Sequence, residues 1–298
     1  MSAADRLALA AVILIWGLNF VVMKLGLQGL SPMLLGALRF ALASLPLLLL
    51  VRPPRLPARW LLAYGLAQGL GQFGLLFSAL QLGMTAGMAS VVIQTQAFFT
   101  LLLAMPLLGE RASVRQWVGL AVALAGLAAI GSAAGGPGQM TLVGFVLTLG
   151  AALMWAVSNL IGRLALRAGG AYDPLGFIVW SSLAPILPFT ALALWQDGPA
   201  AVWAQLGGLD ARGLGAVLYL ALLATVLAYS LWTRLLQRHA PARVAPWSLL
   251  VPVVGLWAAA MAFDERPLPQ QWLGTGLVLL GLLIGQGLLR RPSRPGGG

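Results

Sequence analysis

The chain has 298 residues, of which 60% are hydrophobic and 8% are charged, and its mean hydropathy is +0.92. Soluble domains carry roughly a quarter charged residues, so this composition excludes an ordinary soluble protein. The formal net charge is +11 and there is no cysteine, which excludes disulfides, thiol chemistry and thiolate metal sites. Because the basic residues lie in alternate connections rather than in one patch with aromatic residues, the charge does not indicate nucleic-acid binding.

Long apolar stretches fill nearly the whole chain. A helix needs about 20 apolar residues to cross ~30 Å of hydrocarbon, and ten stretches approach that length. In chain order they lie at about 7–27, 33–51, 60–82, 84–108, 114–133, 140–166, 174–195, 212–237, 243–263 and 269–289. The sequence therefore predicts an all-α polytopic membrane protein with ten transmembrane helices, followed by a disordered tail at 291–298.

The arginines mark alternate connections between these stretches. If the N terminus is cytoplasmic, the outer loops hold only Arg212 and Arg266. The inner side then holds Arg6, Arg52, Arg55, Arg59, Arg111, Arg115, Arg163, Arg167, Arg234, Arg238, Arg243, Arg290, Arg291 and Arg294. Cytoplasmic loops carry such an excess of basic residues. We therefore expect both termini in the cytoplasm, and the short loops favour the inner membrane of a bacterium.

Two sequence motifs occur twice. LIWGLNFVVMKLGL at 14–27 returns as LMWAVSNLIGRLAL at 153–166, and GERASVRQWVGLAVALAGL from residue 109 returns as DERPLPQQWLGTGLVLLGL from residue 264. Each repeat, 1–137 and 138–290, holds five spans, and five is odd. The second copy must therefore cross the membrane in the opposite direction. Inverted repeats that enclose a site near the bilayer midplane are the architecture of secondary transporters.

With these motifs the chain resembles the drug/metabolite transporter superfamily, and within it the EamA-type group of ten-helix carriers, over about residues 7–289. The resemblance is carried by Trp16 and Asn19, Trp155 and Ser158, Gly109-Glu110-Arg111 and Asp264-Glu265-Arg266, the last two followed by Q-W-x-G helices. It implies a carrier with a central cavity, in a family that includes many amino-acid exporters. The family often has a proline in the fourth helix, where this chain has Ala97; Pro252 stands in the ninth.

The seven acidic residues all fall at span ends or in loops, and the single histidine, His239, falls in a predicted cytoplasmic loop. A proton-driven exporter of cationic drugs needs a buried carboxylate, so the sequence favours a facilitator or exchanger. A proton-coupled multidrug or nucleotide-sugar antiporter is the alternative, and a channel is less favoured. Intramembrane enzymes need paired acids, H-E-x-x-H or a serine–base pair, so we expect no catalytic residue, cofactor or metal.

Uncharged polar and aromatic side chains inside the spans are the candidates for substrate contact. Helical spacing places some of them on shared faces, as with Trp16 and Asn19. The predicted cavity residues are Trp16, Asn19, Gln68, Gln72, Gln94, Gln96, Trp155, Asn159, Tyr229, Trp232, Trp247 and Ser248, together with Arg39. The alternative for each amide is a hydrogen bond to a neighbouring helix. Arg39 could anchor a substrate carboxylate; the alternative is that it snorkels to the outer interface or pairs with a helix-end carbonyl.

A neutral, amide-lined cavity rich in indoles suits a zwitterionic or neutral metabolite with an apolar side chain. The sequence therefore predicts a carrier that exports amino acids, aromatic ones in particular, by alternating access. Its expected partners are the small-molecule substrate and the lipid bilayer; a monomer is favoured and a dimer stays open. Small residues on the fifth and tenth spans, Gly119, Gly126, Gly274 and Gly281, permit close helix contact, either inside each half or at a seam between two copies.

Overall fold

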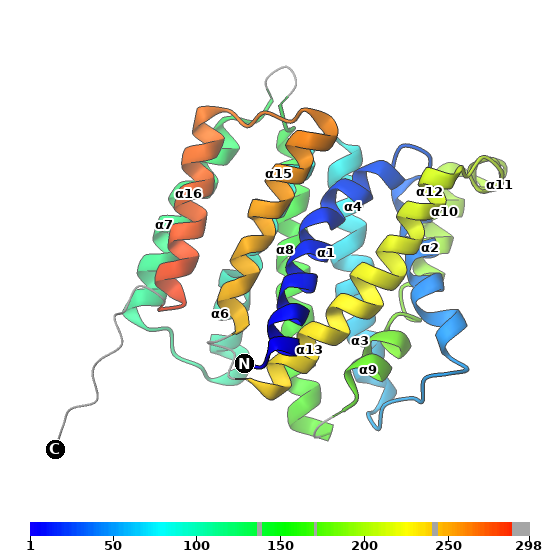
Figure 1. Cartoon of the computed structure of the whole chain (residues 1–298), viewed down its shortest axis with the longest axis horizontal. Helices are drawn as coiled ribbons and strands as arrows, with labels where there is room; N and C mark the ends of the chain where they lie inside the picture. Colours follow the sequence, from blue (N-terminus) through cyan, green and yellow to red (C-terminus); the bar gives the residue numbers. More distant parts are fainter. Residues whose placement is uncertain (136–138, 170–171, 240–243, 288–298) are drawn as a thin grey trace.

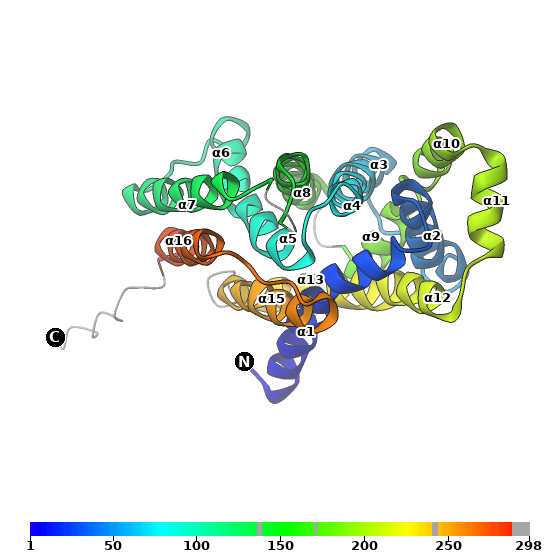
Figure 2. The same ribbon diagram turned by 90° about the horizontal axis from the view of Figure 1, so that it is seen from above.

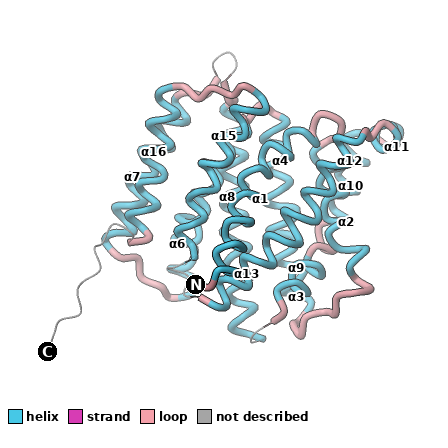
Figure 3. The backbone as a smooth tube through the Cα atoms, in the orientation of Figure 1, coloured by secondary structure: helices cyan, strands magenta, loops and turns pink. Residues whose placement is uncertain are grey.

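The structure is a computed structural model that describes residues 1–135, 139–169, 172–239 and 244–287. Over these ranges every regular element is a helix and no strand occurs, as Figure 3 shows. This confirms the predicted all-helical class. Arg243, Arg290, Arg291, Arg294 and the predicted disordered tail at 291–298 lie outside the described residues.

The helices run between two ends of the molecule and are joined by short connections (Figure 1). The first half contains α1 (Ala3–Gly26), α2 (Pro32–Ser44), η1 (Leu45–Leu47), α3 (Ala58–Gly65), η2 (Leu66–Phe73), α4 (Gly74–Gln81), α5 (Ala86–Val92), η3 (Ile93–Thr95), α6 (Gln96–Leu108) and α7 (Val114–Ser132). The second half contains α8 (Leu142–Gly169), α9 (Pro174–Ser181), α10 (Ile186–Asp197), α11 (Pro199–Gly207), α12 (Ala211–Leu218), η4 (Tyr219–Leu227), α13 (Ala228–Arg238), η5 (Ala245–Leu250), α15 (Val251–Phe263) and α16 (Pro269–Gly285).

Seven helical segments of the described chain are long and apolar enough to cross a membrane. They are Ala3–Gly26, Ala86–Leu108, Val114–Ser132, Leu142–Ala168, Pro174–Asp197, Ala211–Arg238 and Pro246–Phe263. Three further predicted spans are helical but fall short. Pro32–Leu47 and Pro269–Gly285 are too short, and the segment α3–η2–α4 contains Gln68 and Gln72, which lower its hydropathy. A polytopic membrane protein is therefore confirmed, whereas the number ten stays a prediction.

Several predicted spans are not regular α-helices throughout. The third and eighth spans each contain a π-helical segment, η2 and η4, and the fourth and ninth each contain a 3-10 segment, η3 and η5. Pro246 and Pro252 lack the N–H that an α-helical ladder requires, which favours the interruption at η5. The fourth span has Ala97 in place of Pro252, yet η3 ends at Thr95, two positions before it. The two halves thus change helix type at corresponding places.

Helices α7 and α16 pack against each other through glycines. A Cβ added at Gly126 would lie 2.6 Å from the carbonyl oxygen of Gly274, and one added at Gly119 would lie 2.5 Å from that of Gly281. Such distances leave room only for hydrogen, so the two backbones touch. The glycines therefore join the fifth and tenth spans of one chain, rather than packing each half internally. Figure 2 shows this pair at one edge of the helix array.

The first helix is fixed at its start by a capping box, in which Ser2 and Asp5 bond reciprocally. The Asp5 carboxylate also lies 3.0 Å from His239 Nε2 and 3.7 Å from Arg238 Nη1. These contacts tie the start of α1 to the end of α13. The connections that follow α2 and α6 lie at this same end of the molecule (Figure 1). The arginines at 52–59 and 111–115 lie in these connections or in the first turn of the next helix.

Candidate functional site

An aromatic cluster occupies the interior where α1, α8 and α13 meet. The Trp16 ring lies edge-on to Trp155 with centroids 6.3 Å apart, and tilted to Tyr229 at 5.0 Å and Trp232 at 5.4 Å. The Trp16 indole N–H donates to the carbonyl oxygen of Ala224 in η4 at 3.3 Å. The two tryptophans that the repeat makes equivalent, Trp16 and Trp155, therefore touch each other.

A hydrogen-bond network centred on Gln68 lies beside these rings. Gln68 Nε2 donates to Gln72 Oε1 and contacts the Tyr229 hydroxyl, each at 2.6 Å. The Ser158 hydroxyl donates to Gln68 Oε1. Gln68, Gln72, Ser158 and Tyr229 are all buried. The network joins the π-helical segment of the first half to α8 and α13 of the second half.

A second group of amides lies around η3. Gln94 Nε2 donates to the backbone carbonyl of Ser248 at 2.8 Å, and Asn159 Nδ2 donates to Gln96 Oε1 at 2.8 Å. Asn19 on α1 is buried and its Oδ1 has no partner among the described residues. Gln94, Gln96 and Asn159 thus take part in hydrogen bonds between helices, while the Asn19 side-chain oxygen has no partner among the described residues.

Trp247 lies apart from both groups. Its side chain is 45% exposed, and with Leu250 of η5 it borders a groove formed by Arg6, Leu9, Ala10, Ile13 and Leu14 of α1. The groove is apolar, and Trp247 lies near the start of its span, where membrane proteins commonly place tryptophan. The structure therefore brings together the predicted site residues of α1, η2, α8 and α13, but leaves Trp247 at the periphery.

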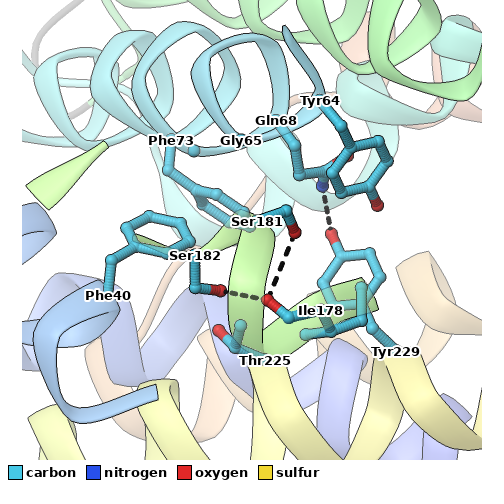
Figure 4. Close-up of a pocket in the computed structure, with 11 residues that line it drawn as sticks. Phe40, Tyr64, Gly65, Gln68, Phe73, Ile178, Ser181, Ser182, Thr225 and Tyr229 are labelled. Carbon is cyan, nitrogen blue, oxygen red and sulfur yellow. Dashed lines mark hydrogen bonds between the residues drawn. The ribbon is translucent and has the colours of Figure 1, made fainter. Parts of the chain in front are cut away.

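A small cavity adjoins the Gln68 network. It is lined by Phe40, Tyr64, Gly65, Gln68, Gly69, Phe73, Ile178, Ser181, Ser182, Thr225 and Tyr229. Its free volume holds about one water molecule. Figure 4 shows the Gln68–Tyr229 hydrogen bond on one side and the hydroxyls of Ser181 and Ser182, which donate to the Ile178 carbonyl, on another. The protein is thus closed around this point.

Arg39 on α2 lies in the interior next to this cavity and has no exposed surface. Its Nε donates to the Thr225 hydroxyl at 2.9 Å, and its Cζ lies 3.7 Å from the ring centroid of Phe73. Both terminal nitrogens, Nη1 and Nη2, lack a partner within the described residues. Since an arginine at the centre of a membrane helix costs ~2.5–3.5 kcal/mol or more, a buried one is a candidate for a functional role. It does not snorkel to the interface.

Two ion pairs join the halves at opposite ends of the molecule. Lys24 Nζ lies 2.8 Å from Glu265 Oε1, and the same carboxylate accepts the backbone N–H groups of Ala86 and Gly87 at 2.9 Å each. The Arg163 guanidinium pairs with Glu110. Each of these bases pairs with the acidic residue of the other half's motif.

Sequence reasoning missed four hydroxyl groups of the site, on Ser158, Ser181, Ser182 and Thr225. In the sequence, Ser158 stands out only through the motif that its helix shares with Trp16 and Asn19. The others gave little signal, because serine and threonine in membrane helices mostly bond the preceding turn of their own helix. Ser181 and Ser182 do this. The neighbourhood of Thr225 and Arg39 comes only from the fold, since they are 186 residues apart.

Comparison with known proteins agrees with this architecture. The EamA-like transporter family matches residues 5–132 and 142–285. A protein of Escherichia coli K12 named "Probable amino-acid metabolite efflux pump" is 40% identical over 284 residues, covering 95% of each chain. The "Uncharacterized inner membrane transporter YedA" of the same strain is 28% identical and covers 97% of this chain and 92% of its own. A solved crystal structure covers 100% of both chains with a TM-score of 0.64 at 19% identity, which shows a shared fold.

The two family matches together span most of the chain, one in each half. The E. coli relative is similar along nearly its full length. The apolar helices and these matches make the protein a multi-pass transporter of the inner membrane rather than an enzyme. The chain belongs to the EamA-like transporter family.

Proposed function

We propose that the protein exports amino acids or closely related metabolites by alternating access, as a monomeric facilitator or exchanger. Ten spans in two inverted repeats, 1–137 and 138–290, would surround the site, with both termini in the cytoplasm. The two family matches, 5–132 and 142–285, support the division into repeats. The paired π-helical segments η2 and η4 support it as well.

The observation that carries the proposal is the buried hydrogen-bonding network of amides and hydroxyls built by both halves. Gln68 of the first half bonds Ser158 and Tyr229 of the second, beside the ring of Trp16. Amides and hydroxyls offer both donors and acceptors, which is what the ammonium and carboxylate of an amino acid require. The name of the E. coli relative, an amino-acid metabolite efflux pump, agrees with this choice of substrate.

Alternating access needs a contact that closes each end in turn, and the two ion pairs supply candidates. We call Lys24, Glu265 and the N–H groups of Ala86 and Gly87 the outer latch, and Arg163 with Glu110 the inner latch. The outer latch is the less exposed of the two: its side chains are 30% and 10% exposed, against 42% and 36% for the inner pair. This difference supports a state that is closed more firmly at the proposed outer end.

Counterflow in proteoliposomes tests the proposal. Labelled phenylalanine, tryptophan, threonine, a nucleotide sugar and a lipophilic cation would each be measured with and without an imposed pH gradient. Saturable exchange of amino acids that ignores the gradient is the expected result. Uptake of the cation alone, driven by the gradient, would refute it and favour a proton-coupled antiporter. The variants Asn19→Leu and Gln94→Leu should lose exchange while remaining folded.

A further inference from the structure

We propose that Arg39 binds the carboxylate of the transported molecule, so that the substrates are carboxylates and not simply amphipathic metabolites. This inference deepens the proposed function and depends on it. It begins from a charge without a counterion. In the part of the chain that the structure describes, the ion pairs involve Lys24, Arg163, Arg238, His239 and Arg266, whereas Arg39 has no carboxylate partner.

The geometry of Arg39 leaves its anion-binding atoms free. Nε is occupied by the Thr225 hydroxyl, and one face of the guanidinium lies on the Phe73 ring. Nη1 and Nη2 remain buried without partners. The free edge of the guanidinium is the part that forms two parallel hydrogen bonds to a carboxylate. Thr225 and Phe73 hold the group in one orientation before the ligand arrives.

The cavity beside Arg39 offers contacts for the rest of an amino acid. Phe40, Phe73 and Thr225 contact Arg39 and also line the cavity. Gln68 and Tyr229 line the same cavity and belong to the buried network. A zwitterion with its carboxylate at Arg39 would present its ammonium to amide and phenol oxygens and to aromatic faces, which attract cations. In the closed state the cavity is too small for an amino acid, so binding requires the helices around it to separate.

Arg39 also has a structural alternative. It contacts η2 through Phe73 and η4 through Thr225, and so cross-links the two π-helical segments. A purely structural arginine would lower stability when replaced, but would not affect the choice between a carboxylate and its neutral analogue. The ratio of affinities for acid and amide therefore separates the two roles.

The experiment measures ligand binding and exchange with matched analogues. Purified protein is titrated with L-phenylalanine, L-phenylalaninamide, phenethylamine and benzoate, and binding is followed by the thermal unfolding midpoint. Counterflow of labelled phenylalanine is measured in parallel. Arg39→Lys keeps the positive charge but loses the paired Nη1 and Nη2 donors, and Arg39→Gln loses both the charge and the pair. Thr225→Val removes the hydroxyl that accepts from Arg39 Nε. Arg212→Gln removes a charge from an exposed arginine and is the matched control.

We expect the wild type and Arg212→Gln to bind phenylalanine at least tenfold more tightly than its amide. Arg39→Gln should bind the two within twofold of each other, and Arg39→Lys should recover part of the preference. Equal preference for the acid in Arg39→Gln and wild type would overturn the carboxylate site while leaving amino-acid export intact. Binding of benzoate but of no amino acid, abolished in Arg39→Gln, would support the site and refute the proposed substrate. Binding of neither class would overturn both.

Discussion

Replacing Lys24 by methionine should open the outer end of the transporter. Lys24 contributes one charge-assisted hydrogen bond of 2.8 Å to Glu265, and such a bond to a charged group is worth about 1.5–3 kcal/mol. Its side chain is 30% exposed, so we take about 2 kcal/mol, toward the lower end of that range. Since about 1.4 kcal/mol is a tenfold change in an equilibrium constant, the outward-open fraction should rise ~30-fold.

The size of the effect should depend on which latch residue is changed. Glu265→Gln weakens three contacts at once, those to Lys24 and to the N–H groups of Ala86 and Gly87, so it should open the outer end more than Lys24→Met does. Glu110→Gln affects a pair whose side chains are 42% and 36% exposed, where a bridge is worth about 0–1 kcal/mol. That change should raise the inward-open fraction fivefold or less.

The absence of cysteine makes this prediction directly measurable. Ser90→Cys introduces a single thiol on α5, one turn beyond Gly87, at a position with no exposed surface. A membrane-impermeant maleimide added from outside labels it in proportion to the outward-open fraction. The control is Arg266→Gln, also in the Ser90→Cys background. Arg266 lies next to Glu265 in the same loop, and the side chains of its pair with Asp264 are 84% and 79% exposed. If Lys24→Met and this control are labelled to extents within threefold of each other, Lys24 does not hold the outer end closed.

Three further predictions follow from packing and hydrogen bonding. Gln68→Leu leaves the hydroxyls of Ser158 and Tyr229 without their buried partner, so counterflow should cease and the free energy of unfolding should fall by about 1–3 kcal/mol; unchanged counterflow would remove this network from the site. Gly274→Ala sets a Cβ 2.5 Å from the Gly126 carbonyl oxygen, whereas Gly276→Ala meets nothing within 4 Å, so only the first should lower the unfolding midpoint, by about 1–3 kcal/mol of overpacking. Trp247→Ala should leave exchange within twofold of wild type, because that ring faces the periphery, while Trp232→Ala should reduce it; the reverse order would move the site to the groove beside α1.

Some contacts in the candidate site could be predicted from the spacing of a few residues. The repeat of Trp16 at Trp155 pointed to two equivalent helices, and their rings meet in the structure. Gln68 and Gln72, four residues apart, were expected on one face, and they share a hydrogen bond. Because polar side chains are costly in hydrocarbon, each such pair stood out against an apolar background.

The partners of these residues could not be predicted in the same way. The repeat shows that Lys24 matches Arg163 and that Glu110 matches Glu265, but it does not say which acid meets which base. That choice depends on how the halves pack, and the partners in the Lys24–Glu265 pair are 241 residues apart. The π-helical segments leave no pattern in composition, because they differ from α-helix only in the backbone ladder. Nothing in the sequence around Thr225 indicates its contact with Arg39, which is 186 residues away.

In the glycine-to-glycine contacts between α7 and α16, a glycine of one helix meets a glycine that is not its repeat counterpart. The motif repeat makes Gly119 equivalent to Gly274 and Gly126 equivalent to Gly281, yet Gly119 touches Gly281 and Gly126 touches Gly274. Reciprocal contact of this kind is what a twofold interface between identical subunits requires. The two halves of this single chain thus pack like the two subunits of a homodimer. Separate expression of the two halves should therefore allow them to find each other through this surface, and a lone first half would present the same surface to an oppositely inserted copy of itself.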